Sequence, residues 1–171
     1  MESDSWHGVM LEEFARLGVR HLPYVPDGAL APLVAQAQKR DEFAVVPLTR
    51  EEEGVGYMAG VVLGGQRGAL LMQTSGVGNS LNAIGSLTMA QRLPLLMVVT
   101  ERGGLGEIVS TQNPFGRALT GVLDAIGIHC FPVARVEDVP QVVEGAVKLA
   151  EVSRVPVVIL LTSLLLGGAK Q

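Results

Sequence analysis

Three consecutive glutamates at positions 51–53 follow Arg50 and run directly into an apolar, glycine-rich segment. Acidic residues in the first turn of a helix interact favourably with the helix dipole, so the triplet is compatible with an ordinary helix start capped by Thr49. The glycines that follow indicate more than a helix start, because each one destabilises a helix by roughly 0.5–1 kcal/mol relative to alanine. We therefore expect another backbone, a partner chain or a ligand to approach this helix closely, with one acid at least partly covered.

The segment QTSGVGNS, residues 73–80, is a second candidate for chemistry. It is compatible with an ordinary tight turn between a strand and a helix, with Ser75 or Asn79 as the helix cap. It is equally compatible with a backbone cradle for a polar or anionic group at a helix N-terminus. Because it matches neither the P-loop nor the dinucleotide-binding pattern, it does not by itself decide between these interpretations.

Residues 100–114 form the one long irregular connection, and long loops in compact domains are often functional or mobile. The connection contains ERGGLGE at 101–107. Arg102 and the nearby Arg117 carry guanidinium groups, which suit bidentate recognition of oxyanions. Either arginine is equally compatible with a solvated surface charge.

The sequence offers little for metal binding or nucleophilic catalysis. His7, His21 and His129 lack the spacing of metal ligands, so we expect them to be structural. Cys130 is the only cysteine and lies in an apolar run, which indicates a core position. The pattern G-x-S-x-G of a serine nucleophile is absent from the sequence.

Composition limits the classes of protein that remain. The formal net charge is -4 and the sequence contains no run of basic residues, which argues against nucleic acid as a partner. No apolar run approaches the ~20 residues that span a bilayer, and the N-terminal residues lack the pattern of a signal peptide. With a single cysteine as well, the sequence predicts a soluble protein of the reducing cytoplasm, with no membrane partner.

Short apolar runs alternate with helix-like stretches along the whole chain. This rhythm predicts a single three-layer α/β domain with a six-stranded, mainly parallel sheet flanked by helices. Since open parallel sheets bind ligands at the carboxyl ends of their strands, the segments that follow the first four runs should lie together. The predicted strands are residues 21–25, 43–48, 69–74, 93–99, 129–134 and 155–161.

Four segments together resemble a known family. They are VPDGALAPL, LTREEEGVGYMAG, MQTSGVGNSLNAIGSL and LPLLMVVTERGGLGE. Their order and spacing are similar to those of the pyrimidine-binding (Pyr) domain of thiamine diphosphate-dependent enzymes. The resemblance is strongest to the alpha subunits of sulfopyruvate decarboxylases, with phosphonopyruvate decarboxylases as near relatives. It extends from about Gly18 to Leu161 and implies one Pyr domain over residues 1–171.

The resemblance implies a catalytic acid. In this family a glutamate at the start of the helix after the second strand contacts N1′ of the aminopyrimidine ring. The family pattern, aligned on Met58 and Ala59, selects Glu52. Glu52 would then point into a covered site between subunits, while Glu51 and Glu53 remain with solvent or neighbouring chains. Its carboxyl would favour the imino tautomer of the ring, which removes the C2 proton of the thiazolium.

The resemblance also implies a shared cofactor site. Thiamine diphosphate would be bound by this chain together with a partner, a beta subunit whose diphosphate-binding (PP) domain carries G-D-G…N and holds Mg²⁺. This chain has PDG at 26–28 but lacks that motif, so we expect an α/β hetero-oligomer, with an α homodimer possible in isolation. The implied cofactor-binding residues are Glu52, Pro26, Asp27, Gly28, Thr74, Ser75, Gly76, Gly78 and Asn79.

The implied reaction is decarboxylation of a three-carbon 2-oxo acid with an anionic tail. Sulfopyruvate, giving sulfoacetaldehyde and CO₂, is the first choice, and phosphonopyruvate or another 2-oxo acid is the alternative. A non-catalytic assembly subunit on the same fold is a further alternative, and the pathway, coenzyme M synthesis or sulfonate breakdown, stays open. Loop position alone suggests the groups that would bind the anionic tail: Arg102, Gln112, Asn113 and Arg117.

Overall fold

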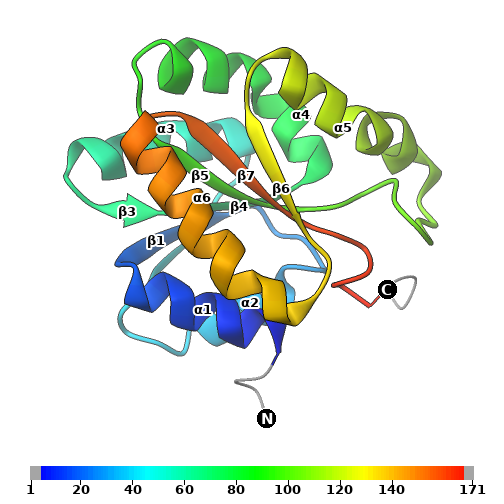
Figure 1. The fold of residues 1–171 in the computed structure, drawn as a ribbon, viewed down its shortest axis with the longest axis horizontal. Coiled ribbons are helices and arrows are strands. Elements are labelled where there is room, and N and C mark those ends of the chain that lie inside the picture. The colour runs from blue at the N-terminus through cyan, green and yellow to red at the C-terminus, as the bar shows by residue number, and fades with distance from the viewer. Residues whose placement is uncertain (1–4, 168–171) are drawn as a thin grey trace.

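Short apolar runs form the strands of one parallel sheet in the computed structural model, which describes residues 5–167. The strands follow one another in the spatial order β2-β1-β4-β5-β7-β6, with β3 paired to β1 (Figure 1). Their bounds are β1 (Val19–Tyr24), β2 (Ala44–Pro47), β3 (Arg67–Gly68), β4 (Leu70–Gln73), β5 (Leu95–Thr100), β6 (His129–Val133) and β7 (Pro156–Leu161). All pairings are parallel, as predicted.

The predicted strand runs are all confirmed, but the sheet has seven strands rather than six. The additional strand, β3, contains only two residues, Arg67 and Gly68. A segment this short carries no alternation of apolar and polar residues, so no pattern in the sequence indicated it.

Helices cover both faces of the sheet, and Figure 1 shows α6 crossing one face near α1. Helices α1, α2 and α6 pack on one face, and α3, α4 and α5 pack on the other. Their bounds are α1 (Trp6–Arg16), α2 (Ala31–Ala37), α3 (Glu51–Leu63), α4 (Thr74–Ala83), α5 (Asn113–Ala125) and α6 (Val139–Ser153). A π-helical stretch, Ile84–Met89, continues α4, and 3₁₀ turns, Ser110–Gln112 and Val136–Asp138, precede α5 and α6. Within residues 5–167, no helix combines the length and apolar character needed to cross a bilayer.

Side chains of the central strands belong to two separate hydrophobic cores, one on each face of the sheet. Successive side chains of a strand point to opposite faces, so Leu96 and Val98 of β5 join the α1/α2/α6 side. Met97 and Val99 of the same strand join the α3/α4/α5 side. Every residue of β5 is buried, which explains why this run is almost continuously apolar in the sequence.

Helix α4 begins at Thr74, directly after β4, so the predicted glycine turn over residues 73–80 is wrong. Neither Ser75 nor Asn79 caps the helix, whose N-cap residue is Gln73. The glycines do not form a turn. They allow side chains of neighbouring helices to pack closely against α4. A Cβ at Gly76 would lie 2.5 Å from Glu51 Cγ, and one at Gly78 would lie 2.9 Å from the Phe115 ring.

Candidate active site

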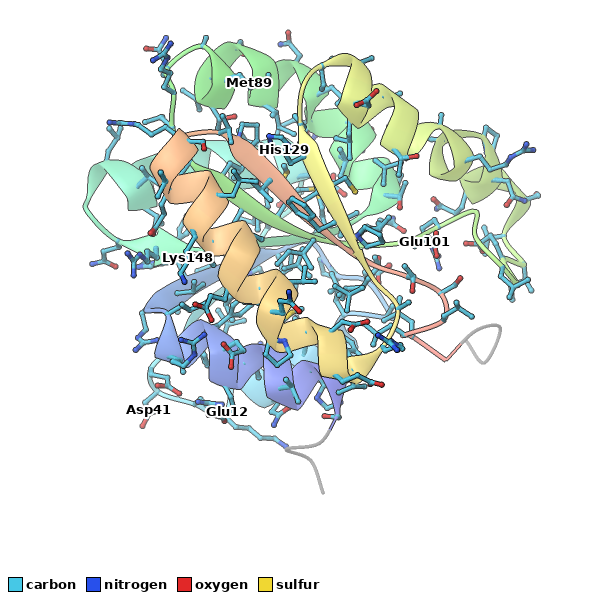
Figure 2. All side chains as sticks on the ribbon, viewed as in Figure 1. Glu12, Asp41, Met89, Glu101, His129 and Lys148 are labelled. Atoms are coloured by element: carbon cyan, nitrogen blue, oxygen red, sulfur yellow. The ribbon has the colours of Figure 1, made fainter. Side chains whose placement is uncertain are left out.

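The carboxyl edge of the sheet brings the predicted segments together. Gln73, the last residue of β4, pairs in register with Thr100, the last residue of β5. The chain therefore leaves these neighbouring strands side by side, into α4 on one side and into the loop 101–109 on the other. Figure 2 labels Glu101 at this edge, where that loop departs from β5. The segments after β1 and β2 reach the same edge, since Leu48 N donates to Tyr24 O at 2.8 Å.

Glu51 is the buried member of the acidic triplet. Its residue is only 7% exposed, although it is the first residue of α3. Val55 and Met58, four and seven residues further, are also buried, so Glu51 lies on the inward face of the helix. Its carboxyl makes no hydrogen bond or ion pair with another residue in the described part of the chain. The Glu51 oxygens are not among the fully buried polar atoms without a partner, so the carboxyl of this mostly covered residue still reaches the surface and is open to a ligand.

Within the single chain Glu52 is only partly buried, and the predicted covering of its carboxyl between two subunits stays a prediction. Its side chain is 34% exposed and forms a 3.0 Å ion pair with Arg50. The hydrogen bonds from the Arg50 guanidinium hold the pKa of Glu52 below its usual value. The catalytic role predicted for Glu52 is a separate matter and stays a prediction.

Glu53 closes the start of α3. Its Oε2 accepts the backbone N–H of Thr49 at 3.0 Å and that of Arg50 at 3.4 Å. The expected cap by Thr49 is therefore replaced by the side chain of the third helical residue, which reaches back over the first turn. The three adjacent acids thus have three different environments.

The first turn of α4 supports the Glu51 side chain. A Cβ at Gly76 would lie 2.5 Å from Cγ and 2.6 Å from Oε1 of Glu51, so only glycine leaves room for the carboxyl there. One turn further along α4, the hydroxyl of Ser80 is buried and has no hydrogen-bond partner in the described chain. The amino ends of α3 and α4 thus both lie close to the Glu51 carboxyl, and such ends favour negative charge.

Asp27 and Thr74 connect the loops at this edge. Asp27 Oδ1 accepts the N–H of Ala29 at 3.0 Å and lies 3.4 Å from Thr100 Oγ1, which donates to it. Thr74 Oγ1 donates to Thr100 O at 2.8 Å and accepts Arg102 N–H at 3.1 Å. These side chains fix the geometry of the edge, whatever else they bind.

The remaining predicted cofactor residues divide by exposure. Pro26, Gly28 and Asn79 are exposed, and Ser75 is partly buried. Gly78 is partly buried and faces the ring of Phe115, so it serves the packing of α4 against α5. Their predicted contacts with a cofactor stay predictions.

The loop 101–109 is held to the rest of the chain at Arg102 and is braced internally by Glu107. The Arg102 backbone is held by Thr74, and a Cβ at Gly116 of α5 would lie only 2.0 Å from Arg102 O. Glu107 accepts the N–H groups of Val109 at 2.8 Å and Gly103 at 3.3 Å. These backbone hydrogen bonds, that of Val109 most, hold the pKa of Glu107 below its usual value.

The four residues suggested for the anionic tail lie in different settings. Arg102 is largely buried, with 21% of its side chain exposed, and its Nε lies 3.8 Å from Glu107 Oε2. Gln112 and Asn113 are partly buried at the start of α5, and Arg117 is exposed. Arg102 also lines a cavity of about 190 Å³ beneath the loop.

The outer face of α3 is open. Gly56 and Gly60 are exposed, and no atom of residues 5–167 lies within 4 Å of the position that a Cβ would take on either. Leu63, one turn further, is 75% exposed. Only Gly54 shows the expected close approach within the chain, because a Cβ there would lie 2.3 Å from Leu70 Cδ1. In the same described range, no group of three or more histidine, cysteine or acidic side chains is placed to hold a metal ion.

Comparison with protein families matches residues 7–107 to the thiamine pyrophosphate enzyme, N-terminal TPP binding domain. The sulfopyruvate decarboxylase subunit alpha of Methanococcus maripaludis is 37% identical over 147 residues, which are 86% of this chain and 88% of the relative. The phosphonopyruvate decarboxylase of Streptomyces hygroscopicus is 31% identical over 136 residues, 80% of this chain but 33% of that protein. The similarity thus extends over nearly all of one relative and about a third of the other.

Among solved structures, the fold is similar to part of a 2-oxoglutarate:ferredoxin oxidoreductase from Magnetococcus marinus. The TM-score is 0.75 with 18% sequence identity, and the match covers 94% of this chain. This chain spans 29% of the length of that protein, so the similarity concerns one part of it and supports the fold alone.

Proposed function

Because the chain belongs to the thiamine pyrophosphate enzymes, as an N-terminal TPP binding domain, we propose that it is the alpha subunit of a 2-oxo acid decarboxylase. The proposed reaction converts sulfopyruvate to sulfoacetaldehyde and CO₂. The similarity to a sulfopyruvate decarboxylase alpha subunit over most of both chains supports this choice. The observation that carries the proposal is the buried carboxyl of Glu51, without a partner at the edge where strands β1, β4 and β5 end.

We propose Glu51, in place of the predicted Glu52, as the acid that binds the aminopyrimidine ring. The residues fit such a ring, because a buried carboxyl without a hydrogen-bond partner suits a ring nitrogen that shares its proton. Gly76 leaves the space that the Glu51 carboxyl needs beside the first turn of α4. When bound, thiamine diphosphate supplies the electron sink that 2-oxo acid decarboxylation requires.

A partner subunit completes the site in this proposal. It would be a beta subunit whose PP domain binds the diphosphate and Mg²⁺, working with this chain in the cytoplasm. The relative's name, which calls it a subunit alpha, supports a partner. So does the phosphonopyruvate decarboxylase, of which the matched part is only 33%. The open face of α3, with Gly56, Gly60 and Leu63, offers an unoccupied surface for such contact.

Two alternatives rest on specific observations. The similarity to a phosphonopyruvate decarboxylase favours phosphonopyruvate as the second substrate candidate. The surface ion pair of Glu52 with Arg50 is what a non-catalytic assembly subunit would also show. Both alternatives make different predictions for the variants below.

The test compares Glu51→Gln with Glu52→Gln in the complex assembled from this chain and its partner. We expect Glu51→Gln to lower kcat by about 10²–10⁴-fold, because a positioned proton-transfer group is lost, and to leave assembly unchanged. Glu52→Gln should retain kcat, because it removes only a surface ion pair. The measurement is CO₂ release from sulfopyruvate, phosphonopyruvate and pyruvate, with subunit composition checked by gel filtration.

Each outcome has a definite meaning. A loss confined to Glu52→Gln would restore Glu52 as the catalytic acid. Full activity in both variants would favour the assembly subunit. Faster turnover of phosphonopyruvate than of sulfopyruvate would identify phosphonopyruvate as the preferred substrate.

A further inference from the structure

Arg102 stands apart from the other arginines because its guanidinium is largely buried and donates no hydrogen bond in the described chain. Its Nε is fully buried, and the nearest anionic oxygen, Glu107 Oε2, lies 3.8 Å away, which is too far for a hydrogen bond. Leaving a buried charged donor unsatisfied costs about 1–3 kcal/mol or more. An arginine kept in this condition is a candidate for binding a ligand.

The other guanidinium groups show the contrast. Arg50, Arg67 and Arg135 each donate to a carboxylate or a carbonyl. Arg92 and Arg117 donate no side-chain hydrogen bond within residues 5–167, but both are exposed, so water satisfies them. Only Arg102 is both covered and without a hydrogen-bond partner in that range.

The backbone around Arg102 is fixed beside the proposed catalytic acid. Thr74 Oγ1 accepts its N–H at 3.1 Å, and Thr74 opens the helical turn whose Gly76 touches Glu51. On the other side, Gly116 leaves no room for Arg102 O to move towards α5. The backbone of Arg102 is therefore positioned by contacts with the first residue of α4 and with α5.

The carboxylates nearby have other donors. Glu107 accepts the N–H groups of Gly103 and Val109, and Glu101 Oε2 accepts that of Ser163 at 2.7 Å. Both acids line the same 190 Å³ cavity as Arg102. Because backbone donors already solvate these carboxylates, the terminal nitrogens of Arg102 are left for another oxyanion.

We propose that Arg102 binds the anionic tail of the 2-oxo acid, through the oxygens of its sulfonate or phosphonate group. This inference rests on the proposed function and selects one residue from the four that loop position suggested. A planar guanidinium can donate two parallel hydrogen bonds to a tetrahedral oxyanion, which a lysine ammonium does not reproduce. Arg102 is then a specificity-determining residue, while Glu51 serves the reaction itself.

The test uses Arg102→Gln, Arg102→Lys and, as a control, Arg135→Gln in the assembled complex. Arg135 is an exposed arginine that follows β6 and pairs with Asp138. We expect Arg102→Gln to lower kcat/KM for sulfopyruvate by at least about tenfold, mainly through KM, since a charged hydrogen bond to the tail is lost. The kcat/KM for pyruvate, which lacks the anionic tail, should stay the same in Arg102→Gln. Arg102→Lys should retain part of the kcat/KM for sulfopyruvate that Arg102→Gln loses.

Two results would overturn the inference. If Arg102→Gln lowered kcat/KM equally for sulfopyruvate and pyruvate, the role of Arg102 would be structural. If it changed neither value, and so left their ratio unchanged, Arg102 would have no role in specificity. A shift of that ratio in Arg117→Gln, with none in Arg102→Gln, would move the tail contact to Arg117.

Binding of sulfoacetate, measured by calorimetry, separates this inference from the proposed function. Sulfoacetate carries a sulfonate but has no keto group to react. A complex that decarboxylates no 2-oxo acid would end the proposed function, yet tighter sulfoacetate binding by the wild type than by Arg102→Gln would still support Arg102. An active wild-type complex with equal sulfoacetate binding in both forms would end this inference alone.

Discussion

At the scale of single residues, neighbouring side chains of one type acquire different chemistry from their direction alone. Glu51 points inward beside Gly76, Glu52 pairs with Arg50 at the surface, and Glu53 caps the helix. A carboxyl is useful for proton transfer when it is removed from water and free of a permanent partner. Of the three, only Glu51 meets both conditions.

Gly76→Ala tests the support of the Glu51 carboxyl. The new methyl would lie 2.5 Å from Glu51 Cγ, so the side chain must move, and overpacking of this kind costs about 1–3 kcal/mol. We expect decarboxylation by the complex to fall at least about tenfold, since a small misplacement of a catalytic group is enough. The measurement pairs kcat with urea unfolding.

Gly54→Ala is the matched control for Gly76→Ala. A Cβ there meets Leu70 and Leu48, so it strains α3, the helix that carries Glu51, on its core side without touching the Glu51 carboxyl. Gly54→Ala should lose stability and keep most of its kcat. Equal losses of kcat in the two variants would mean that helix strain, and not the position of Glu51, explains the effect.

At the scale of elements, helix starts and loop fastenings shape the carboxyl edge. Helix α4 begins directly after β4, and Gly76 and Gly78 admit neighbouring side chains. Thr74 holds the loop 101–109 at Arg102, and Glu107 braces the loop from within. A loop fixed in this way can hold Arg102 in one position. The long connection is therefore a built part of the edge.

Glu107 gives this loop a pH-dependent stability. Its pKa in the folded protein lies below the usual value of 4.5, so its ionisation favours folding above about pH 4.5. That contribution is lost as the pH falls through the lower pKa of the folded state. We expect Glu107→Gln to be less stable than the wild type at pH 7, by about 1 kcal/mol, with the difference narrowing below pH 4.5. Urea unfolding of both proteins across this range measures it, and a difference independent of pH would contradict the assignment.

At the scale of the whole molecule, one face of α3 is left open by the rest of the described chain. Gly56 and Gly60 leave a flat surface that ends at the exposed Leu63. Within the isolated chain these glycines have no packing role, because no atom of the described residues occupies the space where their side chains would be. Such a surface fits close approach by a partner, at the expense of helix stability.

Gly56→Ala should therefore have opposite effects on the chain and on the complex. We expect the isolated chain to gain about 0.5–1 kcal/mol, because alanine favours the helix and meets no neighbour. Binding of the partner should weaken, since the methyl prevents close approach. Thermal unfolding of the chain and the Kd of the complex are the two measurements.

Gly145→Ala on α6 is the control for this prediction, because it is also exposed and open but lies on the opposite face of the sheet. It should give the same gain in helix stability and leave the Kd unchanged. Weaker binding in both variants, or in neither, would remove α3 from the interface.

The sequence by itself determined the fold class, the order of strands and helices along the chain, and the edge at which the proposed site lies. These follow from local periodicity and from the rule that parallel strands end at one edge, so β5 and β7 were predictable from their continuous apolar runs. The strand β3 was too short to leave a pattern.

Only the tertiary structure decided which acid is buried and which arginine lacks a partner. A signal for Glu51 was present, since Val55 and Met58 follow it at helical spacing, but the rotation of α3 against α4 was needed to select that face. Arg102 left no such signal, because its burial depends on how its loop packs against Thr74 of α4 and Gly116 of α5. Local patterns fix the type of an element, whereas burial of a particular side chain depends on contacts between elements.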